Sequence, residues 1–266
     1  MFLFGCPVGL RQLMPIMKDQ IRHVRHRFDR RSRARVHVVY FSCARDTQLL
    51  LLSLQSLRRM PEFCRASVNI VVDEKGPFDA GQEASICSLF PAVRFLHLGK
   101  IDWASLDTLK TELKAFSIVA EQADPEDLIA KVDSDILFFS ATKLDEVCAS
   151  REDFIGDGHY SGYGYAQGGL YFMRATVAQA LRKYASLERI EQAIDRCGIP
   201  AEDQVVSALL KEMRVSRWLT RLMLFPGEYE RARINSAWVR AEFATIHFVH
   251  RKKDMPVYLE KICGIC

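Results

Sequence analysis

Short apolar runs of strand length alternate with helical stretches through the first half of this chain. The strand-like runs cover residues 36–41, 67–72, 93–98 and 128–132. Leucine-rich stretches with helical spacing cover residues 47–57 and 105–122, and Asp124-Pro125 ends the second of them. Because the strand runs are apolar throughout, we expect them to be buried on both faces. The pattern therefore predicts an α/β fold with a mostly parallel sheet between helices.

The second half opens with a glycine-rich stretch. Six of the 14 glycines fall between Gly156 and Gly169, which predicts a loop that bends tightly or approaches a ligand closely. The elements expected after it are a strand over 170–173, helices over 175–184, 187–196 and 202–213, and a strand over 245–249. Without an internal repeat or a low-complexity linker, we expect one domain over 36–258, between a leader (1–35) and a tail (259–266).

Charge is distributed unevenly between the leader and the rest of the chain. Of the 37 Lys+Arg and 33 Asp+Glu, residues 1–35 hold nine basic and two acidic side chains, so the leader carries +7 and the remainder −3. The remainder lacks the basic surplus that nucleic-acid binding needs, and we expect no nucleic-acid partner. Residues 14–35 combine helical apolar spacing with a basic face. This fits a helix on an anionic membrane surface, or equally an arm that is solvated or packed on the body.

Cysteine usage and hydropathy bear on cellular location. The eight cysteines are scattered, no secretory signal pattern is present, and no run of about 18 apolar residues could span a bilayer. We therefore expect reduced thiols and a cytoplasmic protein, peripheral on the inner membrane face if the leader docks there. Cys263 and Cys266 could bind zinc, but a frayed tail is the simpler interpretation.

The sharpest motif is Asp133-x-Asp135, which directly follows the apolar run 128–132. Parallel α/β sheets bind ligands at the carboxyl ends of their strands, where these side chains would lie. Two carboxylates there can hold Mg²⁺ or Mn²⁺ and leave positions open for phosphate oxygens. The alternative is a strand-end turn with solvated carboxylates, because Asp-x-Asp is common by chance.

With this motif the chain resembles the glycosyltransferases of the GT-A fold, which bind a nucleotide-sugar through Asp-x-Asp and a divalent metal. Within that fold it resembles the retaining family that contains glycogenin and the bacterial lipopolysaccharide galactosyl- and glucosyltransferases. Four blocks follow the family's order: Asp133-x-Asp135, Gln167-Gly168-Gly169 before a strand, Asp203-Gln204 opening a helix, and His247-x-x-His250-x-x-Lys253. The resemblance implies a GT-A (Rossmann-like) sheet, mostly parallel and flanked by helices.

The resemblance also implies a metal site and a diphosphate contact. His247 would be the third metal ligand beside Asp133 and Asp135, through a neutral imidazole. A buried strand histidine is the alternative. Lys253 would contact the departing diphosphate as a point charge, whereas Lys252 fits a solubilising neighbour.

The central blocks bear on the transfer step. By the same resemblance, Gly168 and Gly169 would let the backbone approach the donor sugar, although a tight turn also explains them. Gln204 would lie near the anomeric carbon. Because glutamine is a poor nucleophile, a retaining enzyme would then use a same-face attack. Asp203 would belong to the site or would stabilise the first turn of its helix. In an inverting enzyme, Asp203 or Glu202 would be the general base.

The nucleotide is expected on the first strands. Ser42 ends the first predicted strand, and Asp73 ends the second, where it could accept from a uracil imide or a ribose hydroxyl or simply form a turn. Lys110 and Lys114 lie four apart on the helix before Asp133. The resemblance implies a basic residue there for the diphosphate, and we favour Lys114.

The glycine-rich stretch is expected to border the acceptor, because mixed aromatic and polar side chains suit sugar rings. Its candidate residues are Asp153, Asp157, His159, Tyr160, Tyr163 and Tyr165. A mobile loop without a binding role is the alternative.

Three functions are therefore compared. The favoured one is a metal-dependent glycosyltransferase that moves a hexose from a nucleotide-sugar, UDP-linked in the first instance, to a glycan or lipid-linked acceptor. The second is a haloacid-dehalogenase-like phosphohydrolase with Asp133 as nucleophile, although Leu137 stands where that motif has Thr or Val. The third is a non-catalytic binding module, against which the intact set Asp133, Asp135 and His247 argues.

Overall fold

The computed structural model describes residues 34–63, 66–90, 92–102, 104–158, 165–231 and 237–263. It also describes two short strands, β1 (Phe2–Leu3) and β2 (Cys6–Pro7), which pair antiparallel. The helix predicted within residues 14–35 lies outside the described residues, apart from positions 34 and 35, which are not helical. Cys266 and the loop residues His159, Tyr160 and Tyr163 also lie outside them.

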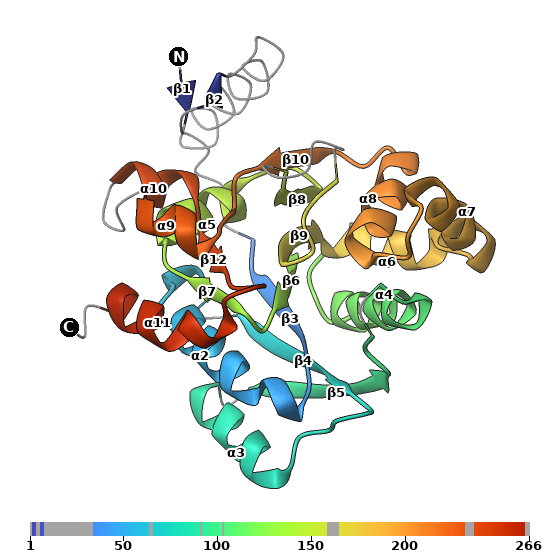
Figure 1. Ribbon diagram of the computed structural model, residues 1–266. Coiled ribbons are helices and arrows are strands. Elements are labelled where there is room, and N and C mark those ends of the chain that lie inside the picture. Colours follow the sequence, from blue (N-terminus) through green and yellow to red (C-terminus); the bar gives the residue numbers. More distant parts are fainter. Residues whose placement is uncertain are drawn as a thin grey trace.

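A seven-stranded sheet forms the centre of the molecule, in the order β10-β8-β9-β6-β3-β4-β5 (Figure 1). Its strands are β3 (Val36–Ser42), β4 (Ser67–Asp73), β5 (Val93–Gly99), β6 (Leu128–Asp133), β8 (Phe154–Asp157), β9 (Leu170–Arg174) and β10 (Arg217–Thr220). Strands β6, β3, β4 and β5 run parallel to their neighbours in that group, whereas β9 is antiparallel to both β6 and β8. The predicted α/β sheet is therefore confirmed, with one reversed strand beside β6.

A second, three-stranded sheet continues from β6. It contains β7 (Ile136–Phe138), β11 (Met223–Leu224) and β12 (Thr245–His247) in the order β11-β12-β7. Only two residues separate β6 from β7, so the chain passes directly from the large sheet to the small one. The Asp-x-Asp motif occupies this junction.

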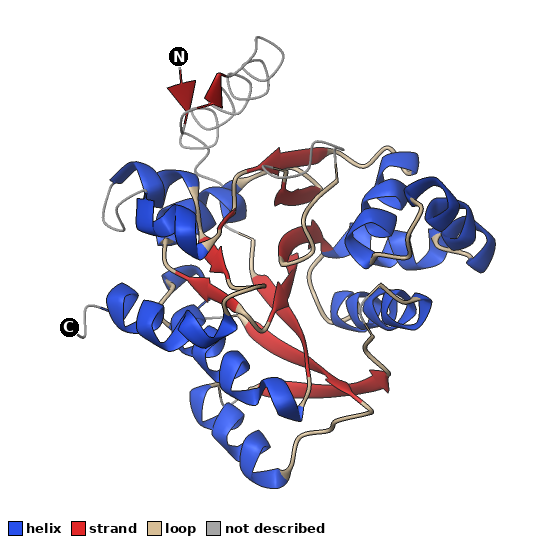
Figure 2. Cartoon of the chain, viewed as in Figure 1, coloured by secondary structure: helices blue, strands red, loops and turns tan. Residues whose placement is uncertain are grey.

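Helices cover the sheets as separate layers (Figure 2). The α-helices are α2 (Thr47–Arg58), α3 (Ala80–Leu89), α4 (Leu106–Ala120), α5 (Ala141–Ala149), α6 (Ala175–Tyr184), α7 (Leu187–Cys197), α8 (Glu202–Glu212), α9 (Pro226–Arg231), α10 (Ala237–Glu242) and α11 (Met255–Cys263). Three short 3₁₀ turns are η1 (Ala44–Asp46), η2 (Pro61–Phe63) and η3 (Lys252–Asp254). Within the described part of the chain, no helix has the length and apolar character needed to cross a bilayer.

The two faces of the large sheet have separate cores. On β3, Val38 and Tyr40 pack with α2, α3 and α5, whereas Val39 packs with α4, α6, α7 and α8. This follows from the two-residue period of a strand, which sends successive side chains to opposite faces. A third cluster joins β7 and β12 to α9, α10 and α11.

Local signals in the sequence set several helix ends. The Ser105 hydroxyl accepts a hydrogen bond from the backbone N–H of Thr108 and so caps α4. Gly198 ends α7 with φ 79°, a left-handed conformation that glycine adopts without a steric penalty. Both helices were predicted, and their ends lie within about two residues of the expected positions, which is ordinary for assignments of this kind.

Candidate active site

The Asp-x-Asp motif is held in a fixed turn between the two sheets. Asp133 is the last residue of β6, and its backbone N–H donates to the carbonyl of Gly169 over 3.0 Å. Asp135 immediately precedes β7, and its carbonyl accepts from the backbone N–H of Phe248 over 2.9 Å. Backbone bonds to two distant segments therefore position both carboxylates.

His247 reaches the same turn from the end of β12. In the antiparallel β12–β7 ladder it lies opposite Ile136, the residue after Asp135. Its Nε2 atom is 3.3 Å from Asp135 Oδ1 and 4.0 Å from Asp133 Oδ2. Each of the three side chains offers a ligand atom, and these atoms all lie within 4.8 Å of one another. The predicted convergence of the three residues is confirmed.

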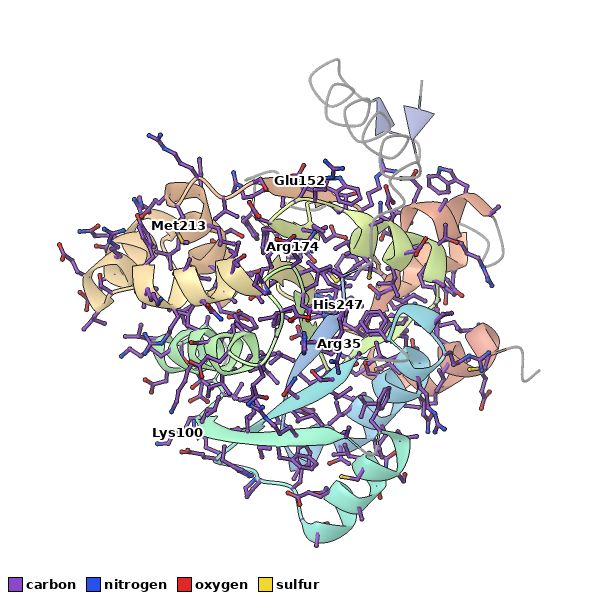
Figure 3. The ribbon with its side chains drawn as sticks, turned by 180° about the vertical axis from the view of Figure 1, so that it is seen from behind. Arg35, Lys100, Glu152, Arg174, Met213 and His247 are labelled. Atoms are coloured by element: carbon purple, nitrogen blue, oxygen red, sulfur yellow. The ribbon has the colours of Figure 1, made fainter. Side chains whose placement is uncertain are left out.

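The imidazole of His247 is positioned by packing. It lies in the middle of the molecule (Figure 3), and the Phe225 ring stacks on it with centroids 6.1 Å apart. A Cβ at Gly169 would be 2.8 Å from His247 Cε1, so only glycine fits there without a shift of the ring. The buried Nδ1 atom has no hydrogen-bond partner among the described residues. This orphaned atom is unusual in a purely structural histidine, and the two oxygens and one nitrogen of the set suit Mn²⁺ or Mg²⁺.

Two lysines partner the carboxylates. Lys131 Nζ lies 2.5 Å from Asp133 Oδ1 and is almost fully buried, and Lys252 Nζ lies 3.3 Å from Asp135 Oδ2 at the surface. Burial alone would raise the pKa of Asp135, but the hydrogen bonds from His247 and Lys252 outweigh it and hold that pKa below its ordinary value. Asp135 is therefore ionised at neutral pH and available as a ligand.

A buried polar cluster lies behind Asp133, on the sheet face covered by α4 and α8. Lys131 points to this face and lies directly opposite Tyr171 in the β6–β9 ladder. The Tyr171 hydroxyl donates to Glu112 Oε1, and burial raises the pKa of Glu112 to about 8 despite the nearby charge of Lys131. Sequence reasoning missed these residues. The available signals were a lysine within an apolar strand and a glutamate on the buried side of a helix.

Asp203 and Gly168 connect this cluster to α8. The Lys131 ammonium donates to the Gly168 carbonyl, and the Gly168 N–H donates to Asp203 Oδ2 over 3.1 Å. Asp203 Oδ1 accepts from the Gln204 N–H over 2.8 Å. Burial, reinforced by the neighbouring Glu202 charge, raises the pKa of Asp203. The predicted glycines therefore adjoin the Asp133–Asp135 turn, and Asp203 is linked to it through Gly168.

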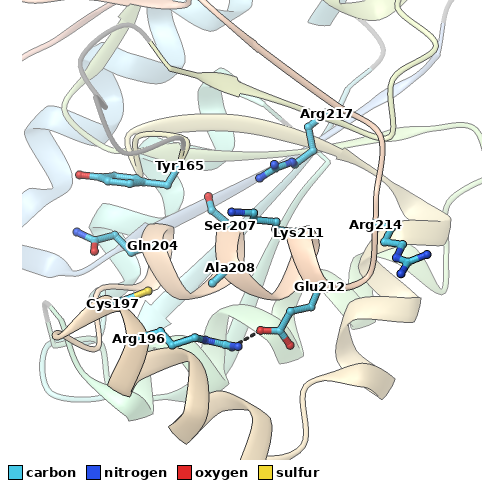
Figure 4. A pocket seen from close by; sticks show the side chains of 10 residues that line it. All are labelled: Tyr165, Arg196, Cys197, Gln204, Ser207, Ala208, Lys211, Glu212, Arg214 and Arg217. Atoms are coloured by element: carbon cyan, nitrogen blue, oxygen red, sulfur yellow. Dashed lines mark hydrogen bonds and ion pairs between the residues drawn. The ribbon is translucent and has the colours of Figure 1, made fainter.

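Gln204 faces a cavity of about 770 Å³ on the other side of Asp203. Figure 4 labels the residues that line it, which are Tyr165, Arg196, Cys197, Gln204, Ser207, Ala208, Lys211, Glu212, Arg214 and Arg217. Four of them, at positions 204, 207, 208 and 211, form one face of α8. Of the residues expected at the acceptor, Tyr165 is the one placed on this cavity within the described part of the chain.

Ser42 and Asp73, the residues predicted to contact the nucleotide, both lie at the carboxyl-terminal ends of their strands, but their surroundings differ. Ser42 ends β3 beside β4, and its buried hydroxyl has no hydrogen-bond partner among the residues that the structure describes. Asp73 uses Oδ1 to accept from the backbone N–H groups of Lys75 and Ile101, which fits the turn-forming alternative. Lys110 and Lys114 are exposed on α4, and no contact of either with the Asp133–Asp135 turn is found in the described structure.

The remaining predicted site residues are two aspartates with structural partners, Asp153 and Asp157, and the exposed Lys253. Asp157 is fully buried and accepts from the backbone N–H groups of Leu222 and Met223, and Asp153 bonds to Ser216. These hydrogen bonds give both carboxylates a structural role. Lys253 is exposed in η3, whereas its neighbour Lys252 contacts Asp135. The lysine that sequence reasoning assigned to solubility is thus the one at the carboxylates.

Comparison with solved structures identifies the fold. The galactosyltransferase LgtC, solved in complex with donor and acceptor sugar analogs, matches with a TM-score of 0.58 at 11% identity, over 86% of this chain and 95% of that one. The glycosyltransferase GlyE from Streptococcus pneumoniae TIGR4, in its apo form, matches with a TM-score of 0.51 at 11% identity, over 88% and 63%. Mouse xyloside xylosyltransferase 1 matches with a TM-score of 0.50 at 9% identity, over 84% and 99%.

These similarities show that the chain has the GT-A fold expected from its motifs. At such low identity they establish the fold and leave the reaction to be argued from the site. No protein-family model matches the sequence, and the search of curated proteins gives no match.

Proposed function

We propose that this chain is a metal-dependent glycosyltransferase that moves a hexose from a nucleotide-sugar to a glycan or lipid-linked acceptor. The observation that carries the proposal is the convergence of Asp133, Asp135 and His247, one ligand atom each, at the junction of the two sheets. The fold supports it, because the similar solved structures are glycosyltransferases. The same comparison offers no support for the phosphohydrolase alternative.

The metal site and its surroundings fit this reaction. Asp133, Asp135 and His247 would hold Mn²⁺ or Mg²⁺, which when bound neutralises a diphosphate and stabilises it as a leaving group. Lys252, exposed beside Asp135, adds a positive charge at the same edge of the sheet. We keep Lys114 and Lys253 as further candidates for diphosphate contact, because both are exposed.

A UDP-linked hexose is the donor that we propose. The buried, unpartnered hydroxyl of Ser42 is available to a nucleoside at the end of β3. In the described structure both hydrogen bonds to the Asp73 carboxylate use Oδ1, which leaves Oδ2 as an acceptor for a ribose hydroxyl or a uracil imide. Gly168 and Gly169 would bring the backbone close to the donor sugar.

For the transfer step, we favour retention of configuration with Gln204 as a positioning group. The bond between the anomeric carbon and the diphosphate oxygen breaks, the acceptor oxygen bonds to that carbon on the same face, and the acceptor proton passes to the leaving phosphate. The support is that the Gln204 side chain faces the cavity, whereas both Asp203 oxygens already accept backbone hydrogen bonds.

Two observations favour the inverting alternative. The raised pKa of Asp203 is what a general base requires, and Glu202 Oε2 is buried without a partner in the described structure. The anomer of the product, assigned by proton NMR, separates the two mechanisms. If the enzyme retains the configuration, Asp203→Asn should lose only a modest part of its rate. If the enzyme inverts it, the same variant should lose about 100-fold or more of its rate, because the general base is removed.

The proposal is tested with Asp135→Asn and its matched control Asp195→Asn, an exposed aspartate on α7. In the wild-type chain we expect Mn²⁺ to support UDP-hexose hydrolysis, and UDP with Mn²⁺ to raise the melting temperature. Asp135→Asn should lower hydrolysis by about 100-fold or more at an unchanged circular-dichroism spectrum. Unchanged turnover in this variant, or release of phosphate from simple phosphate esters, would contradict the proposal.

Peripheral membrane binding is a separate part of the proposal and depends on the leader. Deleting residues 1–35 should weaken binding to anionic vesicles and leave turnover on a soluble acceptor unchanged. Loss of both would mean that the leader is part of the folded body.

A further inference from the structure

Each aspartate of the proposed metal site has one carboxylate oxygen near His247 and the other beside a lysine. His247 Nε2 lies 3.3 Å from Asp135 Oδ1 and 4.0 Å from Asp133 Oδ2. The other oxygen of Asp135, Oδ2, lies 3.3 Å from Lys252 Nζ. The other oxygen of Asp133, Oδ1, lies 2.5 Å from Lys131 Nζ. Each carboxylate therefore presents a single oxygen to the space beside the imidazole.

The two lysines differ in how firmly they hold their aspartates. The side chain of Lys252 is 47% exposed, so water screens its ion pair, whereas that of Lys131 is 4% exposed. The Lys131 ammonium is also fixed by a second bond, which it donates to the carbonyl of Gly168. Asp133 is itself one-third exposed. The buried lysine, rather than packing, therefore fixes the rotation of the Asp133 carboxylate.

A buried lysine is an unusual choice for this position in the sheet. Lys131 lies on β6 opposite Val39 of β3 and Tyr171 of β9, in the interior of the large sheet. Val39 is fully buried and apolar. Apolar residues that replace a buried ion pair often leave stability equal or higher. Stability alone therefore favours an apolar side chain at position 131, and the lysine is explained by what it does to Asp133.

We propose that Lys131 is a positioning residue of the metal site, which holds Asp133 Oδ1 so that the metal receives Oδ2 alone. The inference deepens the proposed function and rests on it for the presence of the metal. Ligands that each offer one oxygen at a fixed angle suit the octahedral geometry of Mn²⁺ and Mg²⁺. Ca²⁺ takes more ligands and accepts both oxygens of one carboxylate. Lys131 would therefore favour the smaller ions over Ca²⁺.

The test compares the affinities of the full chain for Mn²⁺ and Ca²⁺ in the absence of nucleotide. Electron paramagnetic resonance of free Mn²⁺ gives the first affinity, and displacement of bound Mn²⁺ by Ca²⁺ gives the second. In Lys131→Met we expect Mn²⁺ affinity to fall about 10-fold, as when other groups that orient a metal ligand are removed. Ca²⁺ affinity should change by less than about threefold, because a released Asp133 can offer both oxygens. Partial unfolding leaves the ratio unchanged, since it removes sites for both ions equally.

Two further variants separate positioning from a structural role. Lys143→Met is the matched control, because Lys143 is also buried and pairs with Glu146 over 3.1 Å on α5. It should lower the stability to urea and leave the Mn²⁺/Ca²⁺ ratio unchanged. Lys131→Arg keeps a cationic donor for Asp133 and should restore the ratio to within about threefold of wild type. If Lys131→Met does not fold, Lys131→Gln, which keeps a polar group in the buried cluster, takes its place.

An unchanged Mn²⁺/Ca²⁺ ratio in Lys131→Met would overturn the inference. A parallel rise of both affinities would do the same, because it is what the loss of a nearby positive charge alone predicts. A wild-type chain that binds no Mn²⁺ would overturn the metal site and this inference with it. Failure of the proposed transfer reaction is recognised separately, as Mn²⁺ binding that responds to Lys131→Met without any hydrolysis of UDP-hexose.

Discussion

Two histidine–aspartate pairs lie at opposite ends of the parallel strands, and they differ in how completely they are satisfied. At the amino-terminal edge, His37 near the start of β3 bonds to Asp127, just before β6. At the carboxyl-terminal edge, His247 lies beside Asp135. All four side chains are buried.

The His37 pair is closed. Its Nδ1 bonds to Ser67 Oγ over 2.7 Å and its Nε2 to Asp127 Oδ2 over 3.0 Å. Asp127 accepts two further bonds from the backbone N–H groups of Arg35 and Asp124. Every strong hydrogen-bonding atom of the histidine thus has a partner, and the network ties together the starts of three strands.

The His247 pair is open. Its Nδ1 has no partner in the described structure, its Nε2 faces two carboxylates, and one of these, Asp133, is about one-third exposed. A saturated buried network stabilises a fold, whereas an incompletely satisfied one at a strand end is where a ligand gains most. The same residue types therefore form a structural link at one edge and the proposed metal site at the other.

The largest effect on metal binding and activity is expected when a substitution breaks the open pair. His247→Gln should lower Mn²⁺ affinity and Mn²⁺-dependent UDP-hexose hydrolysis by about 100-fold or more, because it removes the only nitrogen ligand of the set. The free energy of unfolding should change by less than about 1 kcal/mol, because Nδ1 has no partner in the described structure and the glutamine amide can replace Nε2 as the donor to Asp135. Calorimetric Mn²⁺ titration and urea unfolding measure the two quantities. A large loss of stability with Mn²⁺ binding intact would assign His247 to the core.

The next largest effect, on stability, is expected when a substitution breaks the closed pair. Asp127→Ala leaves His37 and two backbone N–H groups without their acceptor, and should cost about 2–4 kcal/mol of stability. Turnover per folded molecule should be unchanged, because the pair lies at the edge away from Asp133. Urea unfolding and an activity assay well below the midpoint check this, with Asp195→Ala as the exposed control. Loss of turnover at full folding would show that the two edges are coupled.

A smaller effect tests how tightly the open pair is held. In Gly169→Ala the added Cβ would lie 2.8 Å from His247 Cε1 and must displace the imidazole. We expect Mn²⁺ affinity to fall about 10-fold, as for other changes that disturb ligand orientation. In the matched variant Gly168→Ala the Cβ would lie 3.3 Å from Asp203 Cβ, so the effect on the metal should be weaker. Equal effects of the two variants on Mn²⁺ affinity would contradict this account.

The smallest effect concerns the buried cluster behind Asp133 and depends on pH. Burial raises the pKa of Glu112 from its ordinary 4.5 to about 8. The folded state therefore binds more protons than the unfolded state between these values, so this contribution to stability is complete below about 4.5 and is lost as the pH rises toward 8. Glu112→Gln should flatten the decline of stability between pH 5 and 8, as measured by urea unfolding at several pH values. Parallel curves for variant and wild type would show that Glu112 is ionised in the folded state.

Much of the fold could be predicted because its signals are local. The apolar runs at 36–41, 67–72, 93–98 and 128–132 became β3, β4, β5 and β6 within one or two residues. The short elements were missed, among them β7 and β11, because two or three residues carry no periodicity to detect. The reversal of β9 was also missed, since strand direction depends on the path of the chain between strands and leaves no signal in the strand sequence.

The sequence alone predicted the α/β architecture and the three residues, Asp133, Asp135 and His247, that the structure brings together. An apolar strand that runs into two carboxylates places them at a strand end, and the order of the four blocks indicated His247. Tertiary structure decided which charges surround them. Only the antiparallel β6–β9 ladder brings Lys131 against Tyr171, and only the return of the chain after β12 brings Lys252, rather than Lys253, to Asp135. The physical reason is that residue type and local periodicity are encoded along the chain, whereas ion pairs and the cavity beside Gln204 depend on contacts between segments far apart in sequence.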